Sequence, residues 1–176
     1  KESIDAYNGK HFEDIYISSA SGESWKKPKL FEHSTLANEA PLCISSDNKT
    51  LYFRRADKGT NNLYETTFEN GVWSLPVKLG SNINSGYDEL GLTLTPDGKT
   101  MYFSSSREGG QGKSDIYKCV KGEDGKWGKA EAMGDIINTR GNEVNPFMHP
   151  GGNKLYFSSN GWYSKGMGDY DIFFIA

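Results

Sequence analysis

The sequence predicts an all-β protein: a β-propeller built of four-stranded antiparallel blades. A unit of about 50 residues recurs along the chain, and short aromatic runs alternate with Gly-rich turns inside it. Glycine contributes 21 of the 176 residues, aromatic residues contribute 13%, and no helical periodicity fills the unit. A repeat of this length with short strand-like runs is typical of a propeller blade.

The repeat is defined by four series of residues that keep the same order along the chain. They are the aromatic runs 51–53, 101–103 and 155–157; the tryptophans Trp25, Trp73 and Trp127; the glutamates Glu39, Glu89 and Glu143; and the runs 14–16, 62–64, 115–117 and 171–173. The aromatic runs and the glutamates share spacings of 50 and 54 residues. Because independent markers keep one period, we attribute the repeat to the fold.

Each marker predicts one strand of the blade. The first strand follows the glutamate and ends in a tight turn, where the aligned residues Asn48, Gly98 and Gly152 tolerate positive φ. The aromatic run is the second strand, and its continuous apolar character suits a strand covered on both faces. The run that opens with Asp or Asn is the third strand. The fourth contains the tryptophan, with Pro28 and Pro76 three residues beyond it, and proline favours an edge strand.

These strands divide the chain into four parts: a partial blade at 12–31, blades at 38–79 and 88–133, and a partial blade at 143–176. Propellers typically have 4–8 blades, and each blade buries its faces only against its neighbours. We therefore expect the segment to belong to a larger propeller. Either further chain or a second copy would complete the ring.

Composition narrows the class of partner. The formal net charge is -3 and no block of Lys or Arg stands out, so we expect no nucleic-acid partner. No apolar run approaches the roughly 18 residues of a membrane-spanning helix, so we expect no direct membrane insertion. The cysteines, Cys43 and Cys119, occupy non-equivalent positions of the repeat and are expected to be unpaired.

The repeat resembles the WD40-like repeat of TolB-type periplasmic propellers. The resemblance rests most clearly on Glu89, the Pro-Asp-Gly-Lys turn 96–99, the run Tyr-Phe-Ser-Ser at 102–105, Arg107 with Gly-Gly at 109–110, and Asp-Ile-Tyr at 115–117. It covers nearly the whole chain from about residue 12. The stretches 73–84 and 127–138 look like the version found in Bacteroidetes outer-membrane-associated OmpA-family proteins.

This resemblance implies a non-catalytic scaffold without a cofactor that binds protein partners at the cell envelope, in the periplasm or at the outer membrane. Some members of that family belong to secretion and gliding machinery. Contact with peptidoglycan would come only through a domain outside this chain. Two alternatives stay open: an accessory propeller of a peptidase-type hydrolase whose catalytic domain lies elsewhere, and a carbohydrate-binding propeller.

The candidate partner-binding residues lie where the repeat breaks. Arg54 and Arg55 replace the serines of the other blades, and Trp162 with Tyr163 falls in the last loop between strands. Large aromatic side chains on loops of a rigid scaffold are common interface anchors. The alternative, which stays equally open for Trp162 and Tyr163, is a packed loop cap.

The shared acidic residues have two interpretations. Glu39, Glu89 and Glu143 either form an acidic ring for a basic peptide or a cation, or accept backbone donors where blades meet. We favour the second, since a residue present in every blade more often builds the blade.

The aspartates that open the third strand are expected to be structural. Asp14, Asp115 and Asp171 can accept N–H groups of Gly-rich loops, and Arg107 is a further partner for such a carboxylate. Asp169 and Asp171 alternate with other residues, but the Ca²⁺-loop pattern is absent. No nucleophile motif and no zinc spacing occurs, so no enzyme activity or metal site is expected.

Overall fold

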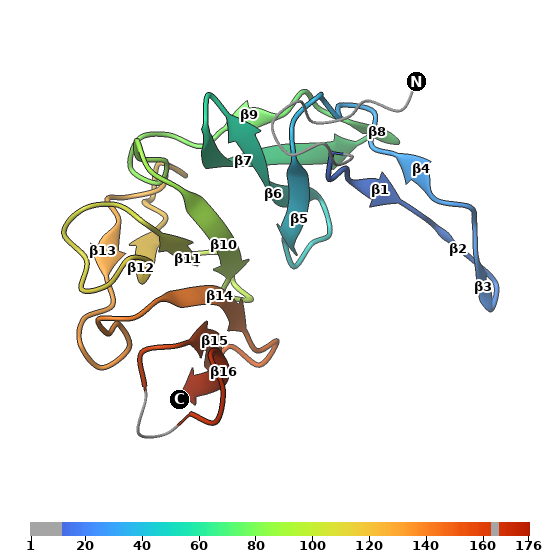
Figure 1. The fold of residues 1–176 in the computed structure, drawn as a ribbon. Helices are drawn as coiled ribbons and strands as arrows, with labels where there is room; N and C mark the ends of the chain where they lie inside the picture. The colour runs from blue at the N-terminus through green and yellow to red at the C-terminus, as the bar shows by residue number, and fades with distance from the viewer. Residues whose placement is uncertain (1–11, 163–165) are drawn as a thin grey trace.

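The computed structural model describes residues 12–162 and 166–176, and these residues contain strands but no helix. The sheets follow one another along an arc, and within the described residues that arc does not close on itself (Figure 1). The all-β, antiparallel prediction is confirmed.

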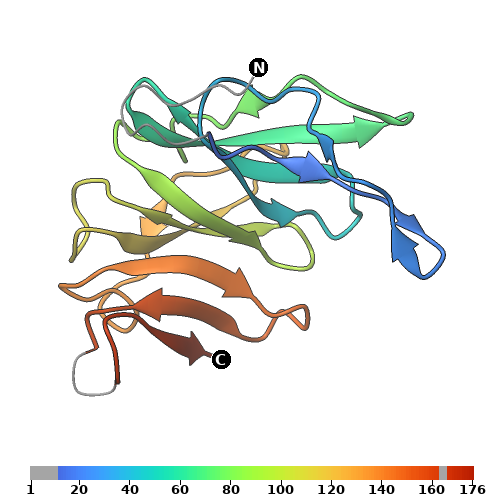
Figure 2. The same ribbon diagram turned by 45° about the vertical axis from the view of Figure 1, so that its right-hand side comes forward.

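The chain begins with a small sheet in which β1 (Tyr16–Ile17) pairs with β4 (Lys29–Leu30). Between them, β2 (Ala20–Ser21) and β3 (Ser24–Trp25) form a hairpin that projects away from the other sheets (Figures 1 and 2). The side chain of Trp25 is exposed there. The first sheet therefore supplies only the outer part of a blade.

The second sheet is an antiparallel meander with a divided outer edge. Its strands are β5 (Glu39–Ile44), β6 (Thr50–Asp57), β7 (Thr60–Glu69), β8 (Val72–Trp73) and β9 (Val77–Lys78). Both β8 and β9 pair with β7, so the single fourth strand expected around Trp73 is split in two. Pro76 lies at the break, because proline has no backbone N–H to donate to a ladder.

The remaining sheets repeat the same order. The third contains β10 (Glu89–Leu94), β11 (Thr100–Ser105), β12 (Asp115–Val120) and β13 (Glu131–Ala132); the last contains β14 (Glu143–Met148), β15 (Leu155–Ser159) and β16 (Asp171–Ile175). The turn after each first strand holds Asn48, Gly98 and Gly152 at φ of 58°, 67° and 73°. The positive φ expected at these three positions is confirmed.

The hydrophobic core lies between neighbouring sheets. Leu63 of β7 is buried against Met101 and Phe103 of the next sheet, together with Ile83 from the connecting segment. Ile116 of β12 is buried in the same way against residues of the last sheet. Each sheet is thus stabilised by its neighbours, as in repeat folds.

The first strands β5, β10 and β14 line the inner side of the arc, most clearly in Figure 2. Gly91 of β10 lies against the backbone of β14. A β-carbon at this position would lie 3.1 Å from Cα of Asn145 and 3.1 Å from Cδ of Pro146. Glycine therefore permits the backbones of β10 and β14 to meet, which brings the starts of the inner strands together.

Candidate functional site

The repeated glutamates are buried inside the blades. Glu39, Glu89 and Glu143 begin the inner strands and expose 1%, 0% and 0% of their surface. A carboxylate without contact with water needs hydrogen bonds or a cation to offset its lost hydration. The contacts of these side chains therefore decide between an acidic ring and an architectural role.

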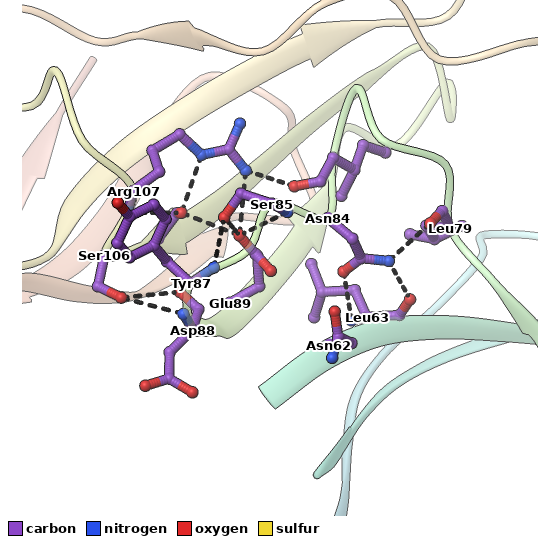
Figure 3. Close-up of polar contacts among 12 residues, drawn as sticks. Asn62, Leu63, Leu79, Asn84, Ser85, Tyr87, Asp88, Glu89, Ser106 and Arg107 are labelled. Atoms are coloured by element: carbon purple, nitrogen blue, oxygen red, sulfur yellow. Dashed lines mark hydrogen bonds and ion pairs between the residues drawn. The ribbon is translucent and has the colours of Figure 1, made fainter. Parts of the chain in front are cut away.

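Glu89 has the fullest set of partners (Figure 3). Its Oε1 accepts hydrogen bonds from the backbone N–H of Ser85 at 3.2 Å, from Ser85 Oγ at 2.6 Å and from Ser105 Oγ at 3.1 Å. Nη2 of Arg107 lies 3.2 Å from the same oxygen. Burial raises the pKa of the Glu89 carboxyl, and the hydrogen bonds from Ser85 and the charge of Arg107 oppose that rise.

Arg107 lies over an aromatic pair. Its guanidinium carbon is 5.0 Å from the ring centre of Phe103 and 4.9 Å from that of Tyr117, which is the range of a cation–π contact. It also donates to the backbone carbonyl of Ile83 in the connecting segment. The structural role expected for Arg107 fits this geometry, but its carboxylate partner is Glu89 and not the aspartate that opens the third strand.

Arg55 occupies the same environment in the second sheet. Its Nε donates to Glu39 at 2.7 Å, its Nη2 donates to the carbonyl of His33 at 2.9 Å, and its guanidinium lies 5.2 Å and 5.0 Å from the ring centres of Phe53 and Tyr64. Only 14% of the side chain is exposed. The expectation that Arg55 faces a partner is therefore corrected: its charge is used inside the blade.

The last sheet has no arginine at its glutamate. Glu143 accepts instead from the backbone N–H of Thr139 at 2.9 Å, from Thr139 Oγ1 at 2.7 Å and from Ser159 Oγ at 2.6 Å. Trp162 packs on Phe173, with the ring centres 6.1 Å apart. Phe173 corresponds to Tyr117, so the indole covers the aromatic residue that Arg107 covers in the third sheet.

Trp162 is consequently half-buried, which favours the packed loop cap over the exposed anchor. The companion residue Tyr163 lies outside the described residues.

Arg54 is the one arginine of the pair that reaches the surface. Its Nη2 lies 3.1 Å from Glu13, and 29% and 62% of the two side chains are exposed.

In contrast, Glu39, Glu89 and Glu143 offer no charged surface to a partner, and their geometry favours the architectural alternative.

The aspartates of the third strand hold loop backbones. Asp115 accepts from the N–H groups of Gln111 and Gly112, and Asp171 accepts from those of Met167 and Gly168. A β-carbon at Gly110 would collide with the Asp115 carboxylate, so the loop requires glycine there. The contacts of Asp171 are of the same structural kind.

The other two members of that series differ. Asn62 bonds to Thr60 of its own strand, because the tight β6–β7 turn leaves no Gly-rich loop for it to hold. Asp14 is half-buried at the start of the first sheet.

Asparagines join neighbouring blades and were missed by the sequence reasoning. Oδ1 of Asn84 accepts from the N–H of Leu63 at 2.7 Å, and its Nδ2 donates to the Leu63 carbonyl at 2.9 Å (Figure 3). Asn138 makes the same two bonds to Ile116, at 2.8 Å and 3.0 Å. We call Asn84 and Asn138 the asparagine hooks. The repeated Ile-Asn pair at 83–84 and 137–138 was the signal in the sequence.

A second group missed by the sequence reasoning lies in the loops before the inner strands, at residues 35–38, 85–88 and 139–142, which we call the front loops. Leu36 is 74% exposed, Tyr87 is 41% exposed and Arg140 is also exposed. Leu36 and Arg140 occupy one repeat position, where the third blade has Gly86. In the sequence, the signal for these loops was that the residue at this one repeat position differs from blade to blade.

The opposite ends of the inner strands enclose a hollow of about 450 Å³. Its lining is mainly apolar and includes Ile44, Leu94, Phe147 and His149. Two faces of the arc thus differ: the front loops present varied side chains, and the far ends present an apolar concavity.

Within the described ranges, no group of three His, Cys, Asp or Glu side chains is placed to hold a metal ion, and no helix has the length and apolar character to cross a membrane. Cys43 and Cys119 are free thiols, as expected. Burial raises the pKa of the Cys119 thiol to about 12, so this group stays protonated at neutral pH.

No protein-family model and no curated protein sequence matches the chain. Solved structures do match in fold. A protein assigned as TolB from Agrobacterium tumefaciens superimposes with a TM-score of 0.59 at 22% identity, over 88% of this chain and 47% of that one. TolB from Acinetobacter baumannii gives 0.59 at 19% identity, over 90% and 34%.

The fold is that of a TolB-like β-propeller. A GH93 α-L-arabinofuranosidase of Fusarium graminearum, solved with arabinobiose, has a lower TM-score of 0.52 at 13% identity, over 93% of this chain and 54% of that one. These likenesses establish the fold alone. This TolB-like segment spans less than half the length of the two TolB structures.

Proposed function

We propose that this TolB-like segment is a non-catalytic scaffold that binds a protein partner at the cell envelope through its front loops. The main support is that the residues shared by the blades and the residues that vary between them lie in different places. The charged groups shared by the blades are buried and paired inside them, whereas the exposed residues of the front loops differ from blade to blade. A rigid frame with varied loops is a common design for recognition.

The composition of the front loops supports a protein partner. Leu36, Tyr87 and Arg140 combine an apolar, an aromatic and a cationic side chain, and aromatic and arginine side chains are enriched at protein interfaces. The hydroxyl of Tyr87 donates to Glu108 at 2.6 Å, which holds the ring in one orientation. Arg54, the exposed member of the arginine pair, is a further candidate contact.

The resemblance to periplasmic TolB-type propellers supports a periplasmic or outer-membrane-associated location. The finer proposal is a place in an outer-membrane secretion or gliding complex. Any contact with peptidoglycan would be made by another domain.

The test is recovery of a partner from envelope extracts by the immobilised chain, with variants that separate the front loops from the outer edge. Leu36→Ser/Tyr87→Ser removes two exposed groups of the front loops. Leu75→Ser is the matched control, because Leu75 is 75% exposed in the link between β8 and β9. We expect the front-loop variant to weaken capture of a defined protein about 30-fold or more, since two interface anchors at more than about 1 kcal/mol each together contribute more than about 2 kcal/mol. Equal capture by both variants, or no partner at all, would contradict the proposal.

A further inference from the structure

The first two junctions between sheets have equivalent connecting segments with different side chains. The first junction joins the first and second sheets, and the second joins the second and third. Leu30 and Lys78 pair with the equivalent tyrosines of β1 and β7, so residues 31–33 correspond to residues 79–81. The segment reads Phe-Glu-His at the first junction and Leu-Gly-Ser at the second. The second junction therefore lacks an aromatic ring, a carboxylate and an imidazole that the first contains.

At the first junction, all three of these side chains contact Trp73 at the outer edge of the second sheet. The ring of Phe31 meets the indole edge-on, with the ring centres 6.1 Å apart. Oε1 of Glu32 accepts from the backbone N–H of Trp73 at 3.0 Å. Nε2 of His33 donates to the Trp73 carbonyl at 3.0 Å. The indole and both backbone groups of this tryptophan are thus occupied from within the chain.

Trp127 holds the equivalent place in the third sheet but has only one of these contacts. Its carbonyl accepts from Nδ2 of Asn82 at 2.8 Å. Its N–H points out of its own hairpin, whose bonds are made by the residues on either side. No acceptor in the described part of the chain lies within hydrogen-bond distance of that N–H, and Gly80 stands where the first junction has Glu32. A hollow of about 390 Å³ remains between Gly80, Ser81 and Trp127, which we call the Trp127 pocket.

The lining of the Trp127 pocket carries more positive than negative charge. Its charged residues are Lys78, Lys121, Lys126 and Glu65. Lys78 is paired with Asp57 at 3.0 Å. Nζ of Lys121 lies 4.8 Å from the ring centre of Trp127, and Lys126 is exposed. These cations favour an anionic group in the pocket, and a carboxylate is the group that accepts from the equivalent N–H at the first junction.

We propose that the Trp127 pocket binds an aromatic side chain and a neighbouring carboxylate of a partner protein. The carboxylate accepts from the Trp127 N–H, and the ring packs against the indole. The first junction supports this occupant, because Phe31 and Glu32 are adjacent in sequence and make those two contacts with Trp73. The pocket lies at the outer edge of the junction, so this contact is separate from the front loops and does not depend on them.

The binding experiment uses the whole chain and a capped peptide of sequence Gly-Ser-Phe-Glu-Glu-Ser-Gly. One control peptide has glutamine in place of both glutamates, and the other has alanine in place of phenylalanine. The NMR shift of the Trp127 amide reports binding. We expect a saturable shift with the first peptide and about tenfold or weaker binding of each control, since a hydrogen bond to a charged group and a buried ring each contribute that much.

A variant that closes the pocket from within provides the second test. Gly80→Glu/Ser81→His gives the second junction the acceptor and the imidazole of the first, and a β-carbon at Gly80 meets no atom within 4 Å. We expect this variant to lose the peptide and to slow exchange of the Trp127 amide about tenfold or more. Gly86→Glu is the matched control, because it adds the same charge in a front loop where a β-carbon also meets open space.

Three outcomes would overturn the proposal. The first is no Trp127 shift with the peptide, or equal binding by wild type and Gly80→Glu/Ser81→His. The second is binding of phenylacetate as tight as that of the peptide, since the ligand would then be a small aromatic acid and not a protein segment. The third is loss of the peptide in Leu36→Ser/Tyr87→Ser, which would place it on the front loops. Unchanged peptide binding in that variant keeps this contact distinct from the one proposed for the front loops.

Discussion

Arg55 and Arg107 occupy different positions in the repeat but the same place in the blade. By strand register Arg55 corresponds to Ser105, because each lies opposite the glutamate that begins its inner strand. Arg107 comes two residues later, after β11 has ended. Both guanidinium groups nevertheless bind that glutamate, cover the stacked aromatic pair and donate to the carbonyl of the connecting segment.

The difference shows that, in these two blades, the guanidinium is defined by its point in space and not by its position in the alignment. A buried carboxylate needs nearby donors, and a long flexible side chain can deliver them from either position. In the last blade, Thr139 and Ser159 bind Glu143, and Trp162 packs on Phe173 of the aromatic pair. The cation itself can therefore be replaced.

Removing either guanidinium should have the largest effect. Arg107→Ala or Arg55→Ala leaves a fully buried carboxylate without its cation, which typically costs about 3 kcal/mol or more. Urea denaturation measures the loss in free energy of unfolding. Arg140→Ala is the control, because that arginine is exposed. A loss as small as the control's would contradict the internal role of these arginines.

Removing a hook should cost less than removing a guanidinium. Asn138→Ala leaves the buried N–H and carbonyl of Ile116 without the amide, and an unpaired buried polar group costs about 1–3 kcal/mol. Asn84→Ala should cost at least as much, since Asn84 also donates to the Leu79 carbonyl. Denaturation curves for both variants measure the loss. A larger loss for Asn138→Ala than for Arg107→Ala would show that hooks, and not ion pairs, dominate the junctions.

The pH dependence of stability should reveal the cost of ionising Glu89. Because burial raises its folded-state pKa above the usual 4.5, the folded protein holds this proton more tightly than the unfolded chain. The stabilisation from that proton is complete below the usual pKa and is lost as pH rises through the raised value.

Glu89→Gln should therefore gain stability relative to the wild type as pH rises across that window. Arg107→Ala should steepen the wild-type decline, since the cation opposes the rise in pKa. Unfolding free energies of the three proteins, measured from pH 4 to pH 8, provide the comparison. Parallel curves for wild type and Glu89→Gln would contradict the role assigned to burial.

The smallest effect is expected at Arg54. Its ion pair with Glu13 is exposed, and such pairs contribute about 0.2–1 kcal/mol. Arg54→Ala should therefore lower the unfolding free energy by less than about 1 kcal/mol. The neighbouring substitution Arg55→Ala should cost several times more. A loss equal to that of Arg55→Ala would remove the distinction between the two arginines.

The sequence was sufficient to predict the first three strands of the blades and the turn after the first strand, because strand patterns and positive-φ residues such as Asn48 act locally. It placed the fourth strand less well, since Trp25 lies in the β2–β3 hairpin and Trp127 lies before β13.

The sequence did not reveal that Arg55 points inward, since burial of a long side chain depends on the neighbouring connecting segment. The sequence could not decide between an exposed anchor and a packed cap for Trp162, because its packing on Phe173 joins residues from a loop and a later strand. Leu36 was overlooked because the loops before the inner strands were not compared from blade to blade.

In the second and third blades, the guanidinium's place in space, rather than its sequence position, stabilises the blade. The swap Ser105→Arg/Arg107→Ser tests this claim most directly, because it gives the third blade the arrangement of the second. We predict that Arg107→Ser alone loses about 3 kcal/mol of unfolding free energy and that the swap restores stability to within about 1 kcal/mol of the wild type. A swapped protein no more stable than Arg107→Ser would contradict the claim.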